Sequence, residues 1–274
     1  MEFPNSPLYQ IPQSTMENSA VKTIDRLVDL LDYFTQGHDA VSLAELSEHL
    51  ELPKSTLHRF LVSLESHGIL RRGANDKKWR PGYHLIVWGS VAAENSVIRE
   101  IAKPFMAELV TASGEMAILT VYHAHEVVCI EMTETNHPVR LKMKVGEQRA
   151  AHAGASSKAL IAFLPEEEIM AIVKDKGLPK LCTNTITDVN ALKAELARIR
   201  KQGYSHSLEE TDPGAWGVAT PVRDWTGRVV GALGLAGPTL RYSEDKVKEY
   251  AALCREYAGR IATALSAPGQ NGNN

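Results

Sequence analysis

The chain has few cysteines, no long apolar run and no excess of basic charge. Its three cysteines, Cys129, Cys182 and Cys254, are widely separated and form no CxxC pair. An odd, scattered set excludes a disulfide framework and a zinc finger and is typical of a reducing compartment. No apolar run approaches the roughly 20 residues that cross a bilayer, and residues 1–20 lack the basic and apolar regions of a signal peptide. We therefore expect a cytoplasmic protein with no membrane partner.

The overall composition gives no sign of a nucleic-acid partner. The formal net charge is −3, with 44% hydrophobic and 23% charged residues, as in an ordinary globular protein. Since domains average roughly 150 residues, a chain of 274 residues predicts two of them. Any surface that binds nucleic acid must therefore be local.

The pattern over residues 21–83 predicts three helices followed by a small hairpin. A first apolar stripe begins after Lys22 and stops at Gly37. The second helix begins at Ser42, where Glu45 completes a capping box. The third runs from Ser55 to about His67, and two short strands around a polar turn follow it. Helix, turn, helix and hairpin in this order predict a winged helix-turn-helix domain.

Basic residues concentrate in this segment, because residues 54–80 hold seven basic and two acidic residues. The inward face of the third helix leaves polar and basic side chains outward, near the helix start that enters a major groove. Basic residues of the hairpin would hold the flanking phosphates. The alternative is a three-helix module whose charges are merely solvated. The residues expected to contact DNA are Lys54, Ser55, Thr56, His58, Arg59, Lys77, Lys78 and Arg80.

The rest of the chain predicts a linker helix over residues 84–100 and an α+β domain over residues 101–266. Residues 1–20 and 267–274 are expected to be disordered tails. The strands and helices expected in the second domain are β segments at 116–122, 126–132 and 139–143, helices at 155–164, 165–174 and 188–202, a hairpin at 217–223 and 228–236, and a final helix at 243–266.

Several runs of this sequence resemble the IclR family of bacterial transcription regulators, in one collinear order over about residues 20–266. They are Leu52–Leu61 with Leu64, Glu65 and Gly68, Trp79–Gly82, Val145-Gly146, His152–Leu160, Gly203-Tyr204, Glu209-Glu210, Gly217–Val222 and Gly234–Pro238. The resemblance implies a winged helix, a linker helix that helps dimerisation, and a GAF-like effector domain with an antiparallel sheet. It also implies a homodimer or homotetramer on a pseudo-palindromic operator in double-stranded DNA. Whether the effector releases DNA or recruits RNA polymerase is left open.

A run of small residues, Ala153–Ser157, opens a helix after His152. Free N–H groups at such a start suit a carboxylate, and close packing of the helix on a sheet is the alternative. The resemblance implies that the effector contacts the main chain at Ala155 and Ser156. It also implies that members sensing small α-keto acids use polar side chains at positions that are small or apolar here. We therefore expect a larger effector than glyoxylate or pyruvate, an aromatic or bulky carboxylic acid, with Met116 and Trp216 as walls. The expected effector-binding residues are Met116, Ala155, Ser156, Ser207, Ala215, Gly217, Gly234 and Ala236.

Two other functions compete with this interpretation. A GAF-type enzyme or metal-binding sensor could use His123, His125 and Cys129, but no carboxylate ligand recurs beside them and no GxSxG, HExxH or P-loop motif is present. We therefore expect no catalytic residue, metal or cofactor. An architectural DNA binder without a ligand would not need the second domain. Glu209 and Glu210 either orient a loop or lie in the site.

Overall fold

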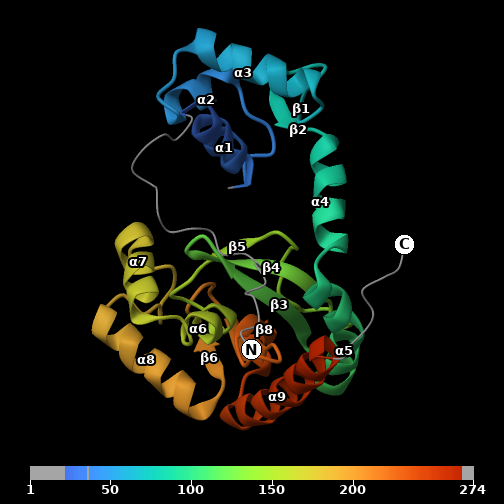
Figure 1. Ribbon diagram of the computed structural model, residues 1–274, viewed down its shortest axis with the longest axis vertical. Coiled ribbons are helices and arrows are strands. Elements are labelled where there is room, and N and C mark those ends of the chain that lie inside the picture. Colours follow the sequence, from blue (N-terminus) through green and yellow to red (C-terminus); the bar gives the residue numbers. More distant parts are fainter. Residues whose placement is uncertain (1–21, 36, 267–274) are drawn as a thin grey trace, which may run out of the picture. The chain divides into compact units, whose positions relative to one another are not determined.

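The computed structural model describes residues 22–35 and 37–266, which divide into two compact units with the boundary between Val91 and Ala92 (Figure 1). The division falls inside the expected linker, residues 84–100. The two expected tails, 1–20 and 267–274, lie outside the described residues. Among the residues described, no helix has both the length and the apolar character required to cross a membrane.

The first unit is a winged helix-turn-helix. Its elements are α1 (Lys22–Thr35), α2 (Leu43–His49), α3 (Lys54–Ser66), β1 (Leu70–Arg72) and β2 (Trp79–Pro81), with β1 and β2 antiparallel. The predicted capping box is present at α2: the Glu45 N–H donates to Ser42 Oγ at 3.2 Å, and the Ser42 N–H donates to Glu45 Oε2 at 2.6 Å. This reciprocal pair satisfies two N–H groups at the helix start and fixes where α2 begins.

The core of this unit joins the wing to the helices. Leu30, Leu46, Leu57 and Leu61 are fully buried, and they pack with Trp79 of β2. Trp79 also exchanges two backbone hydrogen bonds with Val41, at 2.9 and 2.7 Å. The hairpin is therefore held against the helices by both apolar packing and a backbone bridge.

Two helices follow the wing, α4 (His84–Glu94) and α5 (Val97–Ser113). The expected linker therefore covers α4, a break at Asn95 and Ser96, and the first turn of α5. No side chain of α4 is buried, although the helix is rich in apolar residues.

The second unit is built on a six-stranded antiparallel sheet in the order β5-β4-β3-β8-β7-β6. The α+β class expected from the sequence is confirmed. Its strands are β3 (Met116–His123), β4 (Glu126–Thr133), β5 (Gln148–Ala150), β6 (Ser205–Leu208), β7 (Ala215–Arg223) and β8 (Val229–Pro238), and its further helices are α6 (Ala155–Ile161), α7 (Glu166–Lys176), α8 (Val189–Gln202), the 3-10 turn η1 (Thr239–Arg241) and α9 (Glu244–Ser266).

The expected strand at residues 139–143 is wrong, because this segment pairs with no strand and the third strand is β5. Its alternating apolar residues have a different role. Leu141 and Met143 pack on Met116, Ile118 and Cys129 at one end of the sheet. The alternating apolar residues of segment 139–143 therefore pack on the sheet, and the segment does not form one of its strands.

The two faces of the sheet are covered differently. On one face, Ala117, Leu119, Val218 and Leu235 pack against α5 and α9, which lie side by side in Figure 1. The other face carries α6, whose residues pack on β7 and β8 of the sheet and also contact α8. Since α6 has only seven residues, it cannot cover that face from end to end.

A buried ion pair holds α6 to the strand and turn that follow α8. Lys158 of α6 is 1% exposed, and its Nζ donates to Glu210 Oε1 at 2.5 Å, to Glu195 Oε1 at 3.3 Å and to the His206 carbonyl at 3.0 Å. The second oxygen of Glu210 accepts the Gly154 N–H at 3.0 Å. A charge removed from water in this way needs every one of these partners.

Lys158→Met should lower the free energy of unfolding by about 3–5 kcal/mol, because it leaves the Glu210 carboxylate buried without its cation. Urea denaturation measures this loss. The double variant Lys158→Met/Glu210→Gln should regain much of the stability, since an amide can still accept the Gly154 N–H. A double variant no more stable than Lys158→Met would contradict this role of Glu210.

The surroundings of His206 on β6 predict a pH-dependent stability of the second unit. Its ring stacks on Tyr242 with 5.6 Å between ring centroids, and its Nε2 is buried with no hydrogen-bond partner among the described residues. Burial, followed by the positive charges of Lys158 and Arg198, lowers the pKa of His206, against a smaller opposite effect of Glu195 and Glu244. The folded protein therefore keeps a neutral ring at a pH where the unfolded chain binds a proton.

We expect stability to fall as the pH drops below about 6.5, because only the unfolded chain gains the proton there. His206→Phe keeps an aromatic ring on Tyr242 and removes this titration. The variant should therefore lose less stability than the wild type between about pH 7 and pH 5, measured by thermal denaturation over that range. Identical pH dependence in both proteins would show that another group is responsible.

Candidate functional site

Helix α3 presents the polar face that the sequence predicted. Leu57, Leu61 and Leu64 are buried, whereas the expected DNA contacts of this helix are exposed, except Thr56, which is half-buried. Their side chains make no hydrogen bond or ion pair within the described residues, so they are available to an external partner. These residues are Lys54, Ser55, Thr56, His58 and Arg59.

The three cations expected in the wing differ in what they contact. Lys77 is exposed and has no ionic partner in the described chain, and Lys78 Nζ lies 3.9 Å from Glu45 Oε1. The two terminal nitrogens of Arg80 donate to the carboxylate of Asp76, Nη1 to Oδ1 at 3.0 Å and Nη2 to Oδ2 at 2.5 Å. Hydrogen bonds from Arg80 and from the Lys78 N–H hold the pKa of Asp76 well below its usual range. Arg80 therefore closes the turn of the wing, and Lys77 is its most available cation.

The wing has two further exposed arginines that the sequence analysis counted but did not assign. Arg71 lies over the Tyr83 ring, 5.6 Å from its centroid, and Arg72 lies over Trp79 at 4.7 Å. Both follow the buried Leu70 on β1. Stacking on an aromatic ring restrains a guanidinium without neutralising its charge.

A cavity of about 180 Å³ lies in the second unit, where α6 leaves the sheet uncovered. The start of α6, residues 141–143 and residues 211–212 complete its walls. Strand register places Met116 opposite Ala236, Ala236 opposite Gly217, and Gly217 opposite Ser207. Four expected effector residues from four strands therefore form one row across the floor of the cavity.

Seven of the eight expected effector residues line the cavity: Met116, Ala155, Ser156, Ser207, Ala215, Gly217 and Ala236. The eighth, Gly234, lies in the next row of the sheet, where a Cβ atom would come within 3.0 Å of Ser156 Oγ. Gly234 thus provides room for the first turn of α6 and does not line the cavity.

The start of α6 satisfies both interpretations of its small residues. Gly154 has a left-handed φ of +90°, and a Cβ at Gly217 would lie 3.4 Å from Ala155 Cβ, so the helix packs closely on the sheet. Its first N–H groups, from Ala155 to Ser157, have no acceptor among the described residues. Close packing and open donors therefore occur at the same place.

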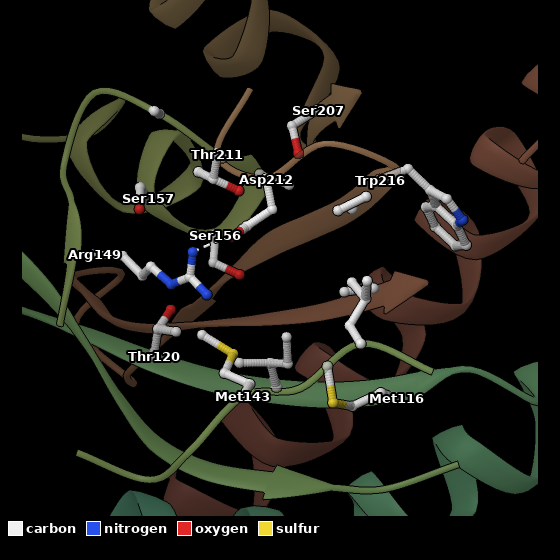
Figure 2. A pocket seen from close by; sticks show the side chains of 18 of the residues that line it. Met116, Thr120, Met143, Arg149, Ser156, Ser157, Ser207, Thr211, Asp212 and Trp216 are labelled. Atoms are coloured by element: carbon white, nitrogen blue, oxygen red, sulfur yellow. Dashed lines mark hydrogen bonds and ion pairs between the residues drawn. The ribbon is translucent and has the colours of Figure 1, made fainter. Parts of the chain in front are cut away.

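Trp216 is among the lining residues, but its indole is held elsewhere. The ring stacks on Tyr250 of α9 with 5.5 Å between centroids, and its Nε1 donates to the Pro238 carbonyl at 3.0 Å. Figure 2 shows the ring directed away from the cavity. Apolar contact with a ligand therefore falls to Met116, Ile118, Val127, Leu141 and Met143.

Arg149 of β5 is the residue of this pocket that the sequence analysis missed. Its side chain reaches into the cavity toward Ser156 (Figure 2). Its Nη1 donates to Asp212 Oδ2 at 2.7 Å, and its Nη2 lies 2.5 Å from Glu147 Oε1. The sequence offered little to find it, because β5 has only three residues and its register was not predicted.

The two glutamates left open by the sequence both orient the turn between β6 and β7. Glu210 binds Lys158 and the Gly154 N–H. Glu209, at a left-handed φ of +49°, accepts the Gly214 N–H at 2.8 Å. This turn carries Thr211 and Asp212 into the cavity wall.

The residues considered for a metal site do not converge. Within the described ranges, no group of three or more His, Cys, Asp or Glu side chains could hold a metal ion. His125 Nδ1 lies 2.9 Å from Asp175 Oδ2, on α7. Cys129 is buried beside Met116 and Ile118, and burial raises the pKa of its thiol to about 12.

Comparison with known proteins agrees with both units. The family model described as the IclR helix-turn-helix domain matches residues 23–74, and that described as the bacterial transcriptional regulator IclR C-terminal matches residues 91–263. The chain is 30% identical to the transcriptional repressor AllR of Escherichia coli K12 over 244 residues, 89% of this chain and 90% of AllR. It is 27% identical to the transcriptional regulator BhcR of Paracoccus denitrificans over 250 residues, 91% of this chain and 89% of BhcR.

Two solved structures extend the comparison to the fold. The IclR of Thermotoga maritima is 30% identical with a TM-score of 0.67, over 90% of this chain and 100% of that one. An IclR homologue of Microbacterium hydrocarbonoxydans, complexed with 4-hydroxybenzoate, is 29% identical with a TM-score of 0.73, over 88% of this chain and 98% of that one. The chain therefore belongs to the IclR family of bacterial transcriptional regulators, with an N-terminal helix-turn-helix domain and a C-terminal effector-binding domain.

Proposed function

We propose that this regulator binds a bulky or aromatic carboxylic acid in the cavity beside α6, and that this binding changes its affinity for operator DNA. The observation that carries the proposal is the row Met116, Ala236, Gly217 and Ser207, which faces the open N–H groups of α6. The wall formed by the start of α6 donates hydrogen bonds to a ligand's oxygens or accepts them from its donors. The opposite walls are apolar. An acid with an apolar body matches this distribution.

The size of the cavity favours an acid larger than pyruvate. A cavity must have a volume of roughly 10–15 Å³ to hold one water molecule, whereas this cavity has a volume of about 180 Å³. Glycine and alanine at positions 217, 215 and 236 leave this space open. A three-carbon acid would leave much of the apolar wall without contact, which forfeits dispersion and hydrophobic stabilisation. The homologue complexed with 4-hydroxybenzoate is a precedent for an aromatic acid in this fold.

For the DNA-binding unit we propose that α3 enters the major groove. Arg59 would address a base edge, with Lys54, Ser55, Thr56 and His58 around it. Lys77 and Lys78 would hold the flanking phosphates, and Arg80 would shape the wing through its pair with Asp76. The support is the exposure of these side chains on one short stretch of the chain.

We propose that the protein acts as a homodimer or homotetramer on a pseudo-palindromic operator. Helix α4 supports self-association, because Ile86, Val87 and Trp88 are each more than half exposed and no α4 residue is buried. An exposed apolar surface of this kind on a single helix indicates a partner. A second copy would place two recognition helices on two half-sites.

The regulatory step follows from linkage. An effector that binds one arrangement of the effector domains more tightly than the other shifts the population toward it, and the linker helix passes the change to the spacing of the recognition helices. RNA polymerase could read the same change. We propose that the chain catalyses no reaction and acts in the cytoplasm, the compartment that holds bacterial DNA.

Arg59→Ala should weaken specific binding by about 1–3 kcal/mol and relax the preference at one base position. Lys77→Ala should weaken binding to all duplexes alike and lower the salt slope by about one. Operators selected from a random pool, with affinities measured over a series of salt concentrations, test both. Lys174→Ala, which removes one exposed charge from α7, is the control and should change neither. Equal behaviour of Arg59→Ala and Lys77→Ala on every duplex would contradict the assigned roles.

Isothermal titration should show 4-hydroxybenzoate or benzoate binding at least about tenfold more tightly than pyruvate or glyoxylate, because the ring fills the apolar end of the cavity. Gly217→Val should abolish this preference, since its side chain would occupy the row facing Ala155. Gly259→Ala on α9, where a Cβ meets no atom within 4 Å, is the matched control. Tight binding of pyruvate alone would overturn the proposed effector class.

A further inference from the structure

Arg149 stands out in the pocket because its guanidinium has N–H donors that the described chain leaves unused. Two of its nitrogens contact Asp212 and Glu147. Its Nε is buried and has no acceptor in the described part of the chain. A buried N–H donor without an acceptor is uncommon in a folded protein. A ligand that brings oxygen atoms to this guanidinium would gain a charge-assisted hydrogen bond that the chain itself does not make.

The two carboxylates on Arg149 are not held equally. Glu147 uses its second oxygen to accept the Lys144 N–H at 3.0 Å, and its side chain is 29% exposed. Asp212 is 51% exposed, and within residues 22–35 and 37–266 its carboxylate makes no hydrogen bond or ion pair except with Arg149. Asp212 can therefore return to water at a smaller cost in lost contacts than Glu147.

A third carboxylate at this guanidinium must displace one of the two already there, because like charges at such short range repel strongly in a partly buried site. We propose that Arg149 is the side chain that binds the effector's carboxylate, beside the open N–H groups of α6, and that it does so by exchanging Asp212 for it. Glu147 stays in place and the total charge around Arg149 is conserved. This inference rests on the proposed function, since it requires an acid in the cavity.

The exchange has a structural consequence in the turn between β6 and β7. Asp212 joins this turn to β5 through Arg149, while Glu210 joins it to α6 through Lys158 and Gly154. Once the effector replaces Asp212, the turn loses its attachment to β5 and keeps those to α6, to residues 184–185 and to Thr239. Binding of the acid is thereby converted into release of the turn from β5.

The two partners of the ion pair should respond oppositely when each is changed. Arg149→Met should weaken binding of 4-hydroxybenzoate by about tenfold to a hundredfold, because it removes a charged donor. It should also remove the preference for 4-hydroxybenzoate over 4-hydroxybenzamide, which lacks the charge. Asp212→Asn should strengthen binding of the acid several-fold, because the competing carboxylate is gone, and leave binding of the amide unchanged. In the Arg149→Met background, Asp212→Asn should strengthen binding of the acid less than it does when Arg149 is present.

Isothermal titration of both probes against these variants tests the exchange, with Arg228→Met as control, since Arg228 pairs with Asp224 at the β7–β8 turn. Hydrogen exchange of residues 209–214 should speed up when the wild type binds the acid. Weaker acid binding in Asp212→Asn, or undiminished binding in Arg149→Met, overturns the inference while leaving the proposed function intact. A wild type that binds none of 4-hydroxybenzoate, benzoate, pyruvate and glyoxylate overturns both.

Discussion

The effector-binding domain depends on one short helix, α6, packing closely against a sheet that is too wide for it. Seven residues cover part of the face, and the glycines at positions 217 and 234 let the helix approach until a Cβ would touch it. The opposite face is closed by α5 and α9, of 17 and 23 residues. The cavity lies beside the start of α6, so the same close packing that stabilises the domain also borders the space for a ligand. A longer helix at this position would remove that space.

Polar interactions around this space connect the packing to regulation. Lys158 joins α6 to Glu210 through an ion pair. Arg149 joins β5 to Asp212, two residues after Glu210 in the same turn. Among its attachments, this turn is therefore tied to α6 by a fully buried ion pair and to β5 by a half-exposed one. With this arrangement, a ligand that replaces Asp212 at Arg149 would leave the ion pair between Lys158 and Glu210 in place. If the effector replaces Asp212 as we propose, a small, local exchange of contacts is enough to give the domain two states.

The sequence predicted the winged helix well because each of its signals is local. The capping box at Ser42, the apolar spacing of α3 and the polar turn of the hairpin act within a few residues, and the structure contains all three. The residues of the row were also expected at the effector site, but from the family resemblance; that they form a row follows from the strand register, which was not predicted. Arg149 was missed because β5 is short and Leu141 and Met143 imitate a strand. The Asp76–Arg80 pair was missed because a count of charges does not show which of them are paired.

Binding of DNA and binding of the acid must influence each other if this regulator works as we describe. By linkage, the factor by which 4-hydroxybenzoate changes operator affinity equals the factor by which operator changes affinity for the acid. Titrating the full-length protein with operator at several acid concentrations, and with acid at several operator concentrations, measures both. We predict two equal factors, each clearly different from one. Saturation of the cavity with no change in operator affinity would contradict the coupling between the two domains.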